Sequence, residues 1–384
     1  SVFPPGQLAT TGTNVLLLAL TAGQAPDVAL AVDQSLPVEF AMRNAIVNLN
    51  QFPDYPEVAK RFRPGALVPF HYRGGDYALP ETQDFWMWFY RTDILNSLKL
   101  RPPNTWDELY DILLPLQQNG LEFYYPAVGQ QAGTAPGYTP FLFQNGGRYY
   151  REDPVLGHVS ALDEPPALKA FIEWTDLYTN YRVQREANFF NRFRTGEMPI
   201  GISGYFTYVL LSTAAPELTG RWEMRPMPGR VQPDGSLDRS AGGTTTTMVI
   251  LKQSKKQRAA WELLKWWSSA DVQVRYGSEL ESLLGVEARW NTANVEGLQR
   301  LPWPPRDIAS VLEQWRWFRE QPVVVGGYFT GRHIVNAWNK VVLKGVNPRE
   351  ALEDAVKDIN RELVRKQEEF GLISDPRLYR QRRG

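Results

Sequence analysis

Cysteine is absent from this 384-residue sequence, and histidine is scarce. Without thiols the chain has no disulfides, thiolate zinc sites, iron–sulfur clusters or cysteine nucleophile. The three histidines, His71, His158 and His333, are far apart and never form an HExxH pattern. We therefore expect no metal site and no cofactor, while the redox compartment stays open because a thiol-free chain works in any of them.

An excess of charge of one sign is also missing, as are long apolar runs. The 42 Lys and Arg residues balance 42 Asp and Glu residues, so no sequence-independent binding to nucleic acid or to an anionic membrane is expected. The longest aliphatic run, residues 15–20, is far shorter than the roughly 20 residues that cross a bilayer. The sequence opens at Ser1 without a visible signal peptide, so we expect a chain that was processed or cut from something longer.

The sequence does contain enough material for two domains, since chains usually divide beyond about 250–300 residues. Helical patterns alternate with short apolar runs throughout, which favours an α/β fold. We predict helices over residues 11–22, after a capping box at Thr105 and Glu108, and after the N-cap Asn347. We predict strands over residues 26–32, 85–90, 198–202 and 244–251.

Aromatic residues are the one marked excess, with 13 Trp, 17 Tyr and 18 Phe. Four tryptophans lie in helical patterns and are expected in the core: Trp261, Trp266, Trp267 and Trp338. Others stand beside Gly or Pro where predicted strands end, namely Tyr138, Tyr205, Phe206, Trp290, Tyr328 and Phe329. Ligands of open α/β sheets bind outside the carboxyl ends of strands, and a flat ring suits the apolar face of a sugar. Core packing is the alternative for each of these residues.

Two catalytic patterns were weighed. Residues 201–204 read Gly-Ile-Ser-Gly, which resembles the start of the Gly-x-Ser-x-Gly motif of a nucleophile elbow. Tyr205 stands at the position of the motif's last glycine, so the motif is incomplete. A glycosidase pair stays open, because it needs only two carboxyl groups roughly 5–10 Å apart. Glu81 and Asp84 are neighbours in sequence, which says little about their separation across a substrate.

Several segments, taken in order, carry a family resemblance. They are residues 17–28 (helix, Gly, then Pro-Asp-Val), 77–82 (Tyr-Ala-Leu-Pro-Glu-Thr), 89–95, 103–109, 193–204 (Phe-x-x-Gly-x-x-Pro-x-Gly around Met198), and Gly242-Gly243 before a strand and a helix with Trp261. Together they resemble the family 1 extracellular solute-binding proteins of ABC importers, the maltose-binding-protein-like group. The resemblance covers nearly the whole chain.

This resemblance implies a two-lobed periplasmic-binding-protein-like fold of type II, with discontinuous lobes joined by crossing strands. Lobe 1 would comprise residues 1–82 and 242–295, and lobe 2 residues 83–241 and 296–384. The family normally opens with a strand–helix–strand unit, for which the residues before the first predicted helix are too few. Lobe 1 is therefore expected to be incomplete, or completed by an upstream segment.

The resemblance also implies the ligand-binding residues. The loop after the strand at residues 26–32 and the first crossing strand match Asp33, Gln34, Ser35, Glu81, Thr82 and Asp84. The remaining matches are Tyr138, Ser203, Gly204, Tyr205, Phe206, Gly243 and Thr244, with Trp290 and Arg332 matching less closely.

The implied function is reversible capture of a small solute, most simply a mono- or oligosaccharide, and its delivery to the transmembrane subunits of an ABC permease. The resemblance implies no catalysis, a monomer, and an extracellular or periplasmic location with a lipid anchor as an option. Two alternatives remain at this point: a carbohydrate-active enzyme that uses Glu81, Asp84 or other acids, and a sensory module of a larger surface polypeptide.

Overall fold

The computed structural model describes residue 16 and residues 18–127 and 135–373. Contacts between residues divide the chain into two compact units. Unit 1 comprises Ser1–Phe85, Gly204–Pro216 and Gly243–Val323, and unit 2 comprises Trp86–Ser203, Glu217–Gly242 and Val324–Gly384.

The contact-based units and the predicted lobes differ in two segments, residues 204–216 and 296–323, whose contacts lie in unit 1. The Tyr205 amide donates to the carbonyl of Phe85, and the Trp315 indole donates to the side chain of Gln83 at 2.6 Å. These bonds tie both segments to the first half of the crossing strand. Elsewhere the two divisions follow each other closely, and the lobe boundaries stay a prediction.

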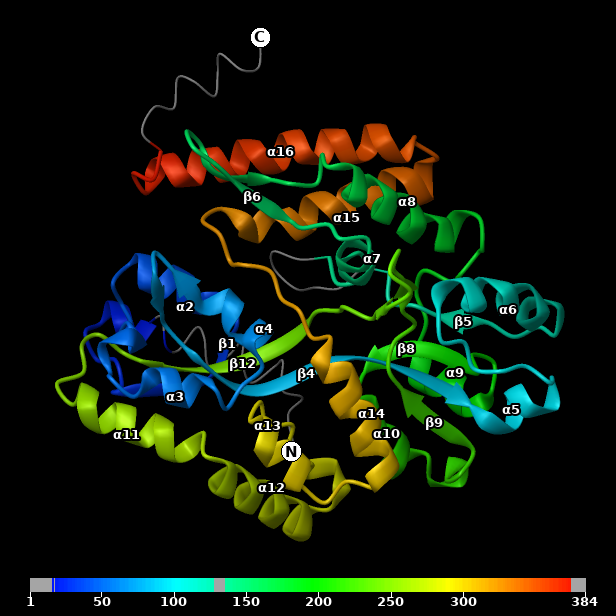
Figure 1. The fold of residues 1–384 in the computed structure, drawn as a ribbon, viewed down its shortest axis with the longest axis horizontal. Coiled ribbons are helices and arrows are strands. Elements are labelled where there is room, and N and C mark those ends of the chain that lie inside the picture. The colour runs from blue at the N-terminus through cyan, green and yellow to red at the C-terminus, as the bar shows by residue number, and fades with distance from the viewer. Residues whose placement is uncertain (1–15, 17, 128–134, 374–384) are drawn as a thin grey trace. The chain divides into compact units, whose positions relative to one another are not determined.

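Unit 1 contains short helices around a three-stranded sheet (Figure 1). Its elements are β1 (Val28–Asp33), α2 (Leu36–Met42), η1 (Leu49–Gln51), α3 (Tyr55–Ala59), α4 (Pro64–Leu67), η2 (Val68–Phe70), β2 (His71–Tyr72), β3 (Gly75–Asp76), the first half of β4 (Leu79–Arg91), α10 (Thr207–Ala214), β12 (Gly243–Ile250), α11 (Gln257–Trp267), α12 (Ala270–Leu284), η4 (Val286–Ala288), α13 (Val295–Arg300) and α14 (Pro305–Arg316).

The unit 1 sheet is antiparallel, with β12 between β1 and β4. Val28 pairs with Ile250, and Gly243 pairs with Phe85. The second half of β12 is buried, because β12 has a strand on each side and packs against α11, and the strand predicted over residues 244–251 is confirmed. The predicted helix over residues 11–22 lies largely outside the described residues, and its end at residues 18–21 is helical.

Unit 2 is larger and more helical. Its elements are the second half of β4, α5 (Thr92–Ser97), α6 (Trp106–Gln118), β5 (Phe123–Tyr124), α7 (Thr139–Gln144), β6 (Tyr150–Asp153), β7 (Gly157–Ser160), α8 (Pro165–Thr179), α9 (Phe189–Thr195), β8 (Ile200–Gly204, of which the last residue belongs to unit 1), η3 (Pro216–Leu218), β9 (Trp222–Arg225), β10 (Arg230–Val231), β11 (Leu237–Asp238), η5 (Gly327–Phe329), α15 (Thr330–Lys344) and α16 (Pro348–Glu369).

The core of unit 2 is built mainly from large aromatic side chains. Strand β8 lies between β4 and β5, and β9 pairs with β4. Trp88, Trp106, Trp174, Tyr125 and Tyr149 are almost completely buried there. The predicted capping box opens α6, and the side chain of Asn347 caps α16 with Pro348 in its first turn, so both sequence predictions are confirmed.

Helix α16 packs against α15, α8 and strand β7 in unit 2, as the red end of the ribbon shows (Figure 1). Two of its amide side chains, two turns apart, bind the outer edge of β7. Asn360 accepts from the Ser160 amide at 2.8 Å, and Gln367 both accepts from and donates to the His158 backbone at 2.7 Å.

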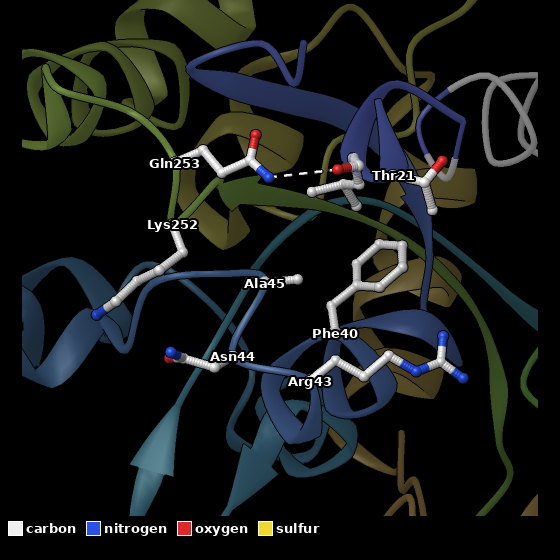
Figure 2. Close-up of a pocket in the computed structure, with 8 residues that line it drawn as sticks. Thr21, Phe40, Arg43, Asn44, Ala45, Lys252 and Gln253 are labelled. Atoms are coloured by element: carbon white, nitrogen blue, oxygen red, sulfur yellow. Dashed lines mark hydrogen bonds between the residues drawn. The ribbon is translucent and has the colours of Figure 1, made fainter. Parts of the chain in front are cut away.

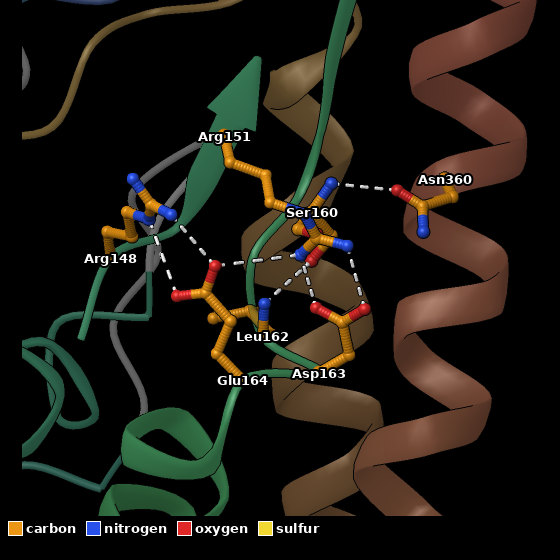
Figure 3. Close-up of polar contacts among 7 residues, drawn as sticks. All are labelled: Arg148, Arg151, Ser160, Leu162, Asp163, Glu164 and Asn360. Carbon is orange, nitrogen blue, oxygen red and sulfur yellow. Dashed lines mark hydrogen bonds and ion pairs between the residues drawn. The ribbon is translucent and has the colours of Figure 1, made fainter. Parts of the chain in front are cut away.

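Arginine side chains complete that edge (Figure 3). Arg151 donates to the Ser160 carbonyl at 2.6 Å and pairs with Asp163, while Arg148 pairs with Glu164 at 2.9 Å. In the sheet pairing of the described residues, no further strand lies on this side of β7. Side chains therefore bond the outward-facing backbone groups of His158 and Ser160 in place of a strand. Within the same described part of the chain, no helix has both the length and the hydropathy that crossing a bilayer requires.

Candidate functional site

Unit 1 contains all the predicted binding residues except Tyr138, Ser203 and Arg332, which belong to unit 2. The unit 1 residues come from the ends of β1, β4 and β12 and from the segments that follow β8 and η4. The sheet pairing brings several of them together, since Thr82 lies opposite Thr246 and Asp84 opposite Thr244.

The carboxylate of Glu81 is the most constrained polar group of this region. It is 6% exposed, and its two oxygens accept from different elements. The Ala31 amide in β1 donates at 2.7 Å, and the Trp267 indole at the end of α11 donates at 2.9 Å. Burial raises the pKa of Glu81, and these donors act in the opposite direction because they favour the charged form.

Three half-buried aromatic side chains pack on one another, and one of them, Trp267, donates to Glu81; we call Trp267, Tyr276 and Trp290 the aromatic trio. Their ring centroids lie 4.9 Å apart for Trp267 and Tyr276 and 5.1 Å apart for Tyr276 and Trp290, in edge-to-face geometry. The charge of Glu81 reaches Tyr276, whose pKa is raised by burial first and by that charge second. The trio thus combines apolar ring faces with a nearby carboxylate.

The backbone beside β4 holds Trp290 in place. Asn291 bonds to Gln83 through both its carbonyl and its side-chain amide at 3.0 Å, and the Ala293 amide donates to the carbonyl of Glu81. The Trp290 indole donates to the buried Gln273 side chain at 2.7 Å. Trp290 is therefore held through its indole and through the backbone of the segment that follows it.

The loop after β1 is folded on itself. Asp33 accepts from the amide of Ser35 at 2.9 Å and from its hydroxyl at 2.6 Å, a turn that places Leu36 at the start of α2. Gln34 donates to the carbonyl of Gly243 at 3.4 Å, and its side-chain oxygen is buried without a partner. On β12, Thr244 is exposed, and the Thr246 hydroxyl lies 2.6 Å from that of Thr82.

Asp84 is held by backbone amides instead of by a charged partner. The Phe206 amide donates to it at 3.2 Å, and a Cβ on Gly204 would lie 2.2 Å from its carboxylate, so glycine is required there. Burial raises the pKa of Asp84 to about 6, against the opposing effect of these amides. Gly243 is equally constrained, because a Cβ would lie 2.1 Å from the Asp84 carbonyl oxygen.

Nearby, a second buried carboxyl group, Glu320, accepts from the Gly243 amide at 2.7 Å. Burial raises its pKa to about 7. Glu81, Asp84 and Glu320 thus each accept from a backbone amide, those of Ala31, Phe206 and Gly243 respectively.

The predicted loop aromatics separate into two groups. Tyr138 and Tyr205 are covered by protein, as the core alternative expected: Tyr138 donates to the Ala167 carbonyl in unit 2, and Tyr205 packs on the ring of Phe85 in unit 1. The neighbouring Gly and Pro residues mark the starts of helices α7 and α10 instead of open loops, which directs both side chains inward. Phe206 and Trp290 stay half-buried.

The other two predicted residues of unit 2, Ser203 and Arg332, lie on two different elements, β8 and α15. Ser203 is half-buried at the end of β8, and Arg332 is exposed on α15 with its guanidinium 4.6 Å from the ring centre of Phe329. The ring centroids of Tyr328 and Phe329 lie 4.0 Å apart.

Sequence reasoning placed Trp267 in the core and did not single out Tyr276. Trp261 and Trp338 are buried as predicted, whereas Trp266 is 58% exposed because Ala260, Trp261 and Leu264 form the buried stripe of α11. Trp290 was predicted as a binding residue, whereas the only signal for Trp267 was local: it is the last residue of its helix, where a side chain can leave the packed stripe.

Two hollows in unit 1 lie away from the predicted residues. One, of about 350 Å³, is lined by Leu20, Thr21, Phe40, Arg43, Asn44, Ala45, Lys252 and Gln253, and Gln253 donates to the Leu20 carbonyl across it (Figure 2). The other, of about 560 Å³, lies among α3, α12 and α13. Neither contains an exposed aromatic face, and the described residues contain no group of three or more acidic or histidine side chains placed to hold a metal.

Known structures with the same fold bind sugars, as their names state. The MalE sugar-binding protein of Xanthomonas citri has a TM-score of 0.77 at 19% identity and covers 94% of this chain and 90% of its own. A solute-binding protein of an ABC transporter from Thermotoga lettingae TMO, bound to α-D-tagatose, has a TM-score of 0.69 at 22% identity, with 92% and 89% covered. Maltose-bound MalE3 of T. maritima has a TM-score of 0.68 at 21% identity, with 92% and 89% covered.

These likenesses confirm the predicted two-lobed, periplasmic-binding-protein-like α/β fold class. None of the curated proteins compared with the chain matches it. A family model described as "Bacterial extracellular solute-binding protein" matches residues 2–274, which is most of the chain. The chain therefore belongs to the bacterial extracellular solute-binding proteins.

Proposed function

We propose that the solute is a mono- or oligosaccharide and that the aromatic trio of unit 1 binds one of its rings. The observation that carries this proposal is the half-buried trio beside Glu81, with the Trp290 indole fixed by Gln273. Aromatic faces suit the C–H face of a sugar, while carboxylates and amides suit its hydroxyls. Two structures of the same fold contain α-D-tagatose and maltose, which supports a carbohydrate as the ligand class.

The remaining predicted residues extend this proposed site. Asp33, Gln34, Ser35 and Thr244 lie at the ends of β1 and at the start of β12, where their polar side chains could meet sugar hydroxyls. The buried side-chain oxygen of Gln34 has no hydrogen-bond partner among the described residues and suits a hydroxyl donor. Phe206 and Arg332 are further proposed contacts.

A thermal-shift screen of mono- and oligosaccharides tests the ligand class. A sugar at a hundredfold excess over its dissociation constant should stabilise the folded protein by about 2.7 kcal/mol, because it binds only that state. An unchanged melting temperature with every sugar would contradict the carbohydrate proposal and leave the family membership intact.

Replacing Trp290 by Ala tests the trio itself. Losing the stacking surface should weaken binding of the best sugar from the screen by about tenfold or more, as for a hot-spot aromatic. Trp266→Ala is the matched control, because Trp266 is exposed on the same α11 that carries Trp267 but lies outside the trio. Equal affinities for Trp290→Ala and the wild type in isothermal titration calorimetry would remove the trio from the site.

We further propose that the protein binds its sugar without altering it and delivers it to an ABC permease. In this proposal it acts as a monomer outside the inner membrane, and a lipid anchor or an upstream segment of the polypeptide would be attached to it. Both oxygens of Glu81 already accept hydrogen bonds, which does not favour the glycosidase alternative. Incubation with oligosaccharides followed by chromatography should show no shortened product. Released sugar would overturn the binding-only proposal.

A further inference from the structure

Two irregular strand segments of unit 1 lie next to each other, and one side chain joins them. In β1, Ala29 pairs with Val249 and Val32 pairs with Thr247, so that Leu30 and Ala31 together oppose a single residue of β12. In β4, Pro80 pairs with Thr247 and Thr82 with Thr246, which leaves Glu81 as an extra residue. Both irregularities are β-bulges, which redirect a strand and release backbone groups from the ladder.

The bulge in β1 has an unusual backbone. Ala31 has a φ of 54°, in the left-handed region that residues with a Cβ rarely adopt. Its amide donates to Glu81 at 2.7 Å, so a buried carboxylate compensates for this conformation. Because Ala31 stands two residues before Asp33, its conformation sets the direction in which the loop at residues 33–35 leaves the sheet.

The second oxygen of Glu81 acts on a different part of the proposed site. It accepts from the Trp267 indole at 2.9 Å and so fixes the rotation of one member of the aromatic trio. Trp267 in turn contacts Tyr276 edge-to-face at 4.9 Å. One carboxylate therefore holds a loop from one edge of the sheet and an aromatic ring from a helix.

We propose that Glu81 is a positioning residue, which fixes the left-handed bend at Ala31 and the indole of Trp267 together and so presets the spacing between the loop at residues 33–35 and the aromatic trio. The proposal rests on the carbohydrate function above, and it replaces direct ligand contact by Glu81 with an action through Ala31 and Trp267. A preset site binds more tightly, because the ligand does not have to order it.

The first test needs no ligand. Glu81→Gln keeps the shape but replaces one acceptor oxygen by a donor that faces another N–H. Hydrogen–deuterium exchange of the segment at residues 28–35, read by mass spectrometry, should become about tenfold faster or more, and the indole proton of Trp267, assigned with Trp267→Phe, should shift in the NMR spectrum. Unchanged exchange together with an unchanged indole resonance would overturn the proposal.

The second test separates positioning from contact. Glycine adopts positive φ freely, and the Ala31 side chain is exposed, so Ala31→Gly should restore the bend without removing core packing. With maltotriose as the probe, Glu81→Gln should weaken binding about tenfold, Ala31→Gly alone should leave it within about twofold, and the double variant should recover a substantial part of the loss. No recovery in the double variant, together with an unchanged Trp267 indole resonance in Glu81→Gln, would mean that Glu81 contacts the sugar directly.

The two proposals fail separately. If wild-type protein binds neither maltotriose nor any other sugar, the carbohydrate function fails, while the exchange and indole results still decide whether Glu81 holds Ala31 and Trp267. If Glu81→Gln does not fold, Glu81→Asp replaces it, since the shorter side chain keeps the charge but cannot reach both donors. Wild-type exchange in that variant would then overturn the proposal.

Discussion

The two units use similar residues for different purposes. In unit 2, Trp88, Trp106 and Trp174 are almost completely buried and pack edge-to-face or tilted against tyrosine and phenylalanine rings. Unit 1 buries Trp261 and Trp315 in the same way, but its Trp266 is exposed, and its Trp267 and Trp290 are half-buried. The aromatic excess of the sequence therefore consists of a core component and a surface component, and only the second is available to a ligand.

Acidic residues show the same contrast. In unit 1, Glu81 and Glu320 are buried and Asp84 is half-buried, and burial raises the pKa of each. In unit 2, by comparison, Arg91 lowers the pKa of Asp93 and Arg194 lowers that of Glu217. Buried carboxyl groups without a cationic partner reduce stability at neutral pH, so unit 1 retains groups that are unfavourable for folding alone.

The largest expected effect tests the core aromatics of unit 2. Trp174→Ala should lower the free energy of unfolding by about 3–5 kcal/mol, because it leaves a large cavity among Tyr138, Phe171 and Trp338. Urea denaturation followed by circular dichroism measures the change. Trp266→Ala in unit 1 is the control and should alter stability by less than about 0.5 kcal/mol; similar losses for both variants would break the comparison.

A pH-dependent effect tests the buried acids of unit 1. Burial raises the pKa of Glu320 to about 7, so the folded chain keeps a proton that the unfolded chain loses near its ordinary value of 4.5. Stability from this group is complete below that value and falls as the pH rises through 7, by up to about 3 kcal/mol. Glu320→Gln still accepts from the Gly243 amide but does not titrate.

The measurement is the difference in free energy of unfolding between Glu320→Gln and the wild type at pH 5 and at pH 8. Relative to the wild type, the free energy of unfolding of Glu320→Gln should be higher at pH 8 than it is at pH 5. Glu57→Gln, at an exposed position, is the control and should show the same difference at both values. A constant difference for Glu320→Gln would indicate that its carboxyl group ionises normally in the folded protein.

The smallest expected effect concerns a helix start in unit 2. The Glu108 amide donates to the Thr105 hydroxyl at 3.2 Å, and the Glu108 carboxylate accepts from the Thr105 amide. Thr105→Ala should cost about 1 kcal/mol, measured by thermal denaturation, and Thr105→Ser should restore most of it. In unit 1, α11 and α12 begin without such a side-chain bond, whereas the side chain of Asn294 caps α13 there.

Local patterns predicted most of the fold. The apolar run before Asp33 forms β1, the capping box opens α6, and Asn347 caps α16, because each depends on residues close in sequence. Sequence periodicity could not locate the aromatic trio. Trp267 follows the core spacing of its helix, yet its indole reaches Glu81, 186 residues away in the chain.

The role of Glu81 was likewise hidden. The family resemblance selected it as a ligand contact, but nothing in its neighbourhood indicates a β-bulge or a bond to Ala31 fifty residues earlier. Register shifts depend on how strands pair, and a single sequence does not specify that pairing. Tyr138 and Tyr205 show the converse, since their Gly and Pro neighbours marked helix starts as readily as loops.

The amide side chains that α16 lays along β7 have one more consequence. An edge strand with unpaired N–H and C=O groups can pair with a strand of another chain, and such pairing leads to aggregation. Asn360 and Gln367 imitate the missing neighbour strand and close this rim from within the same molecule. Helix α16 therefore occupies hydrogen-bonding groups of β7 that a further strand would need, in addition to packing in the core of unit 2.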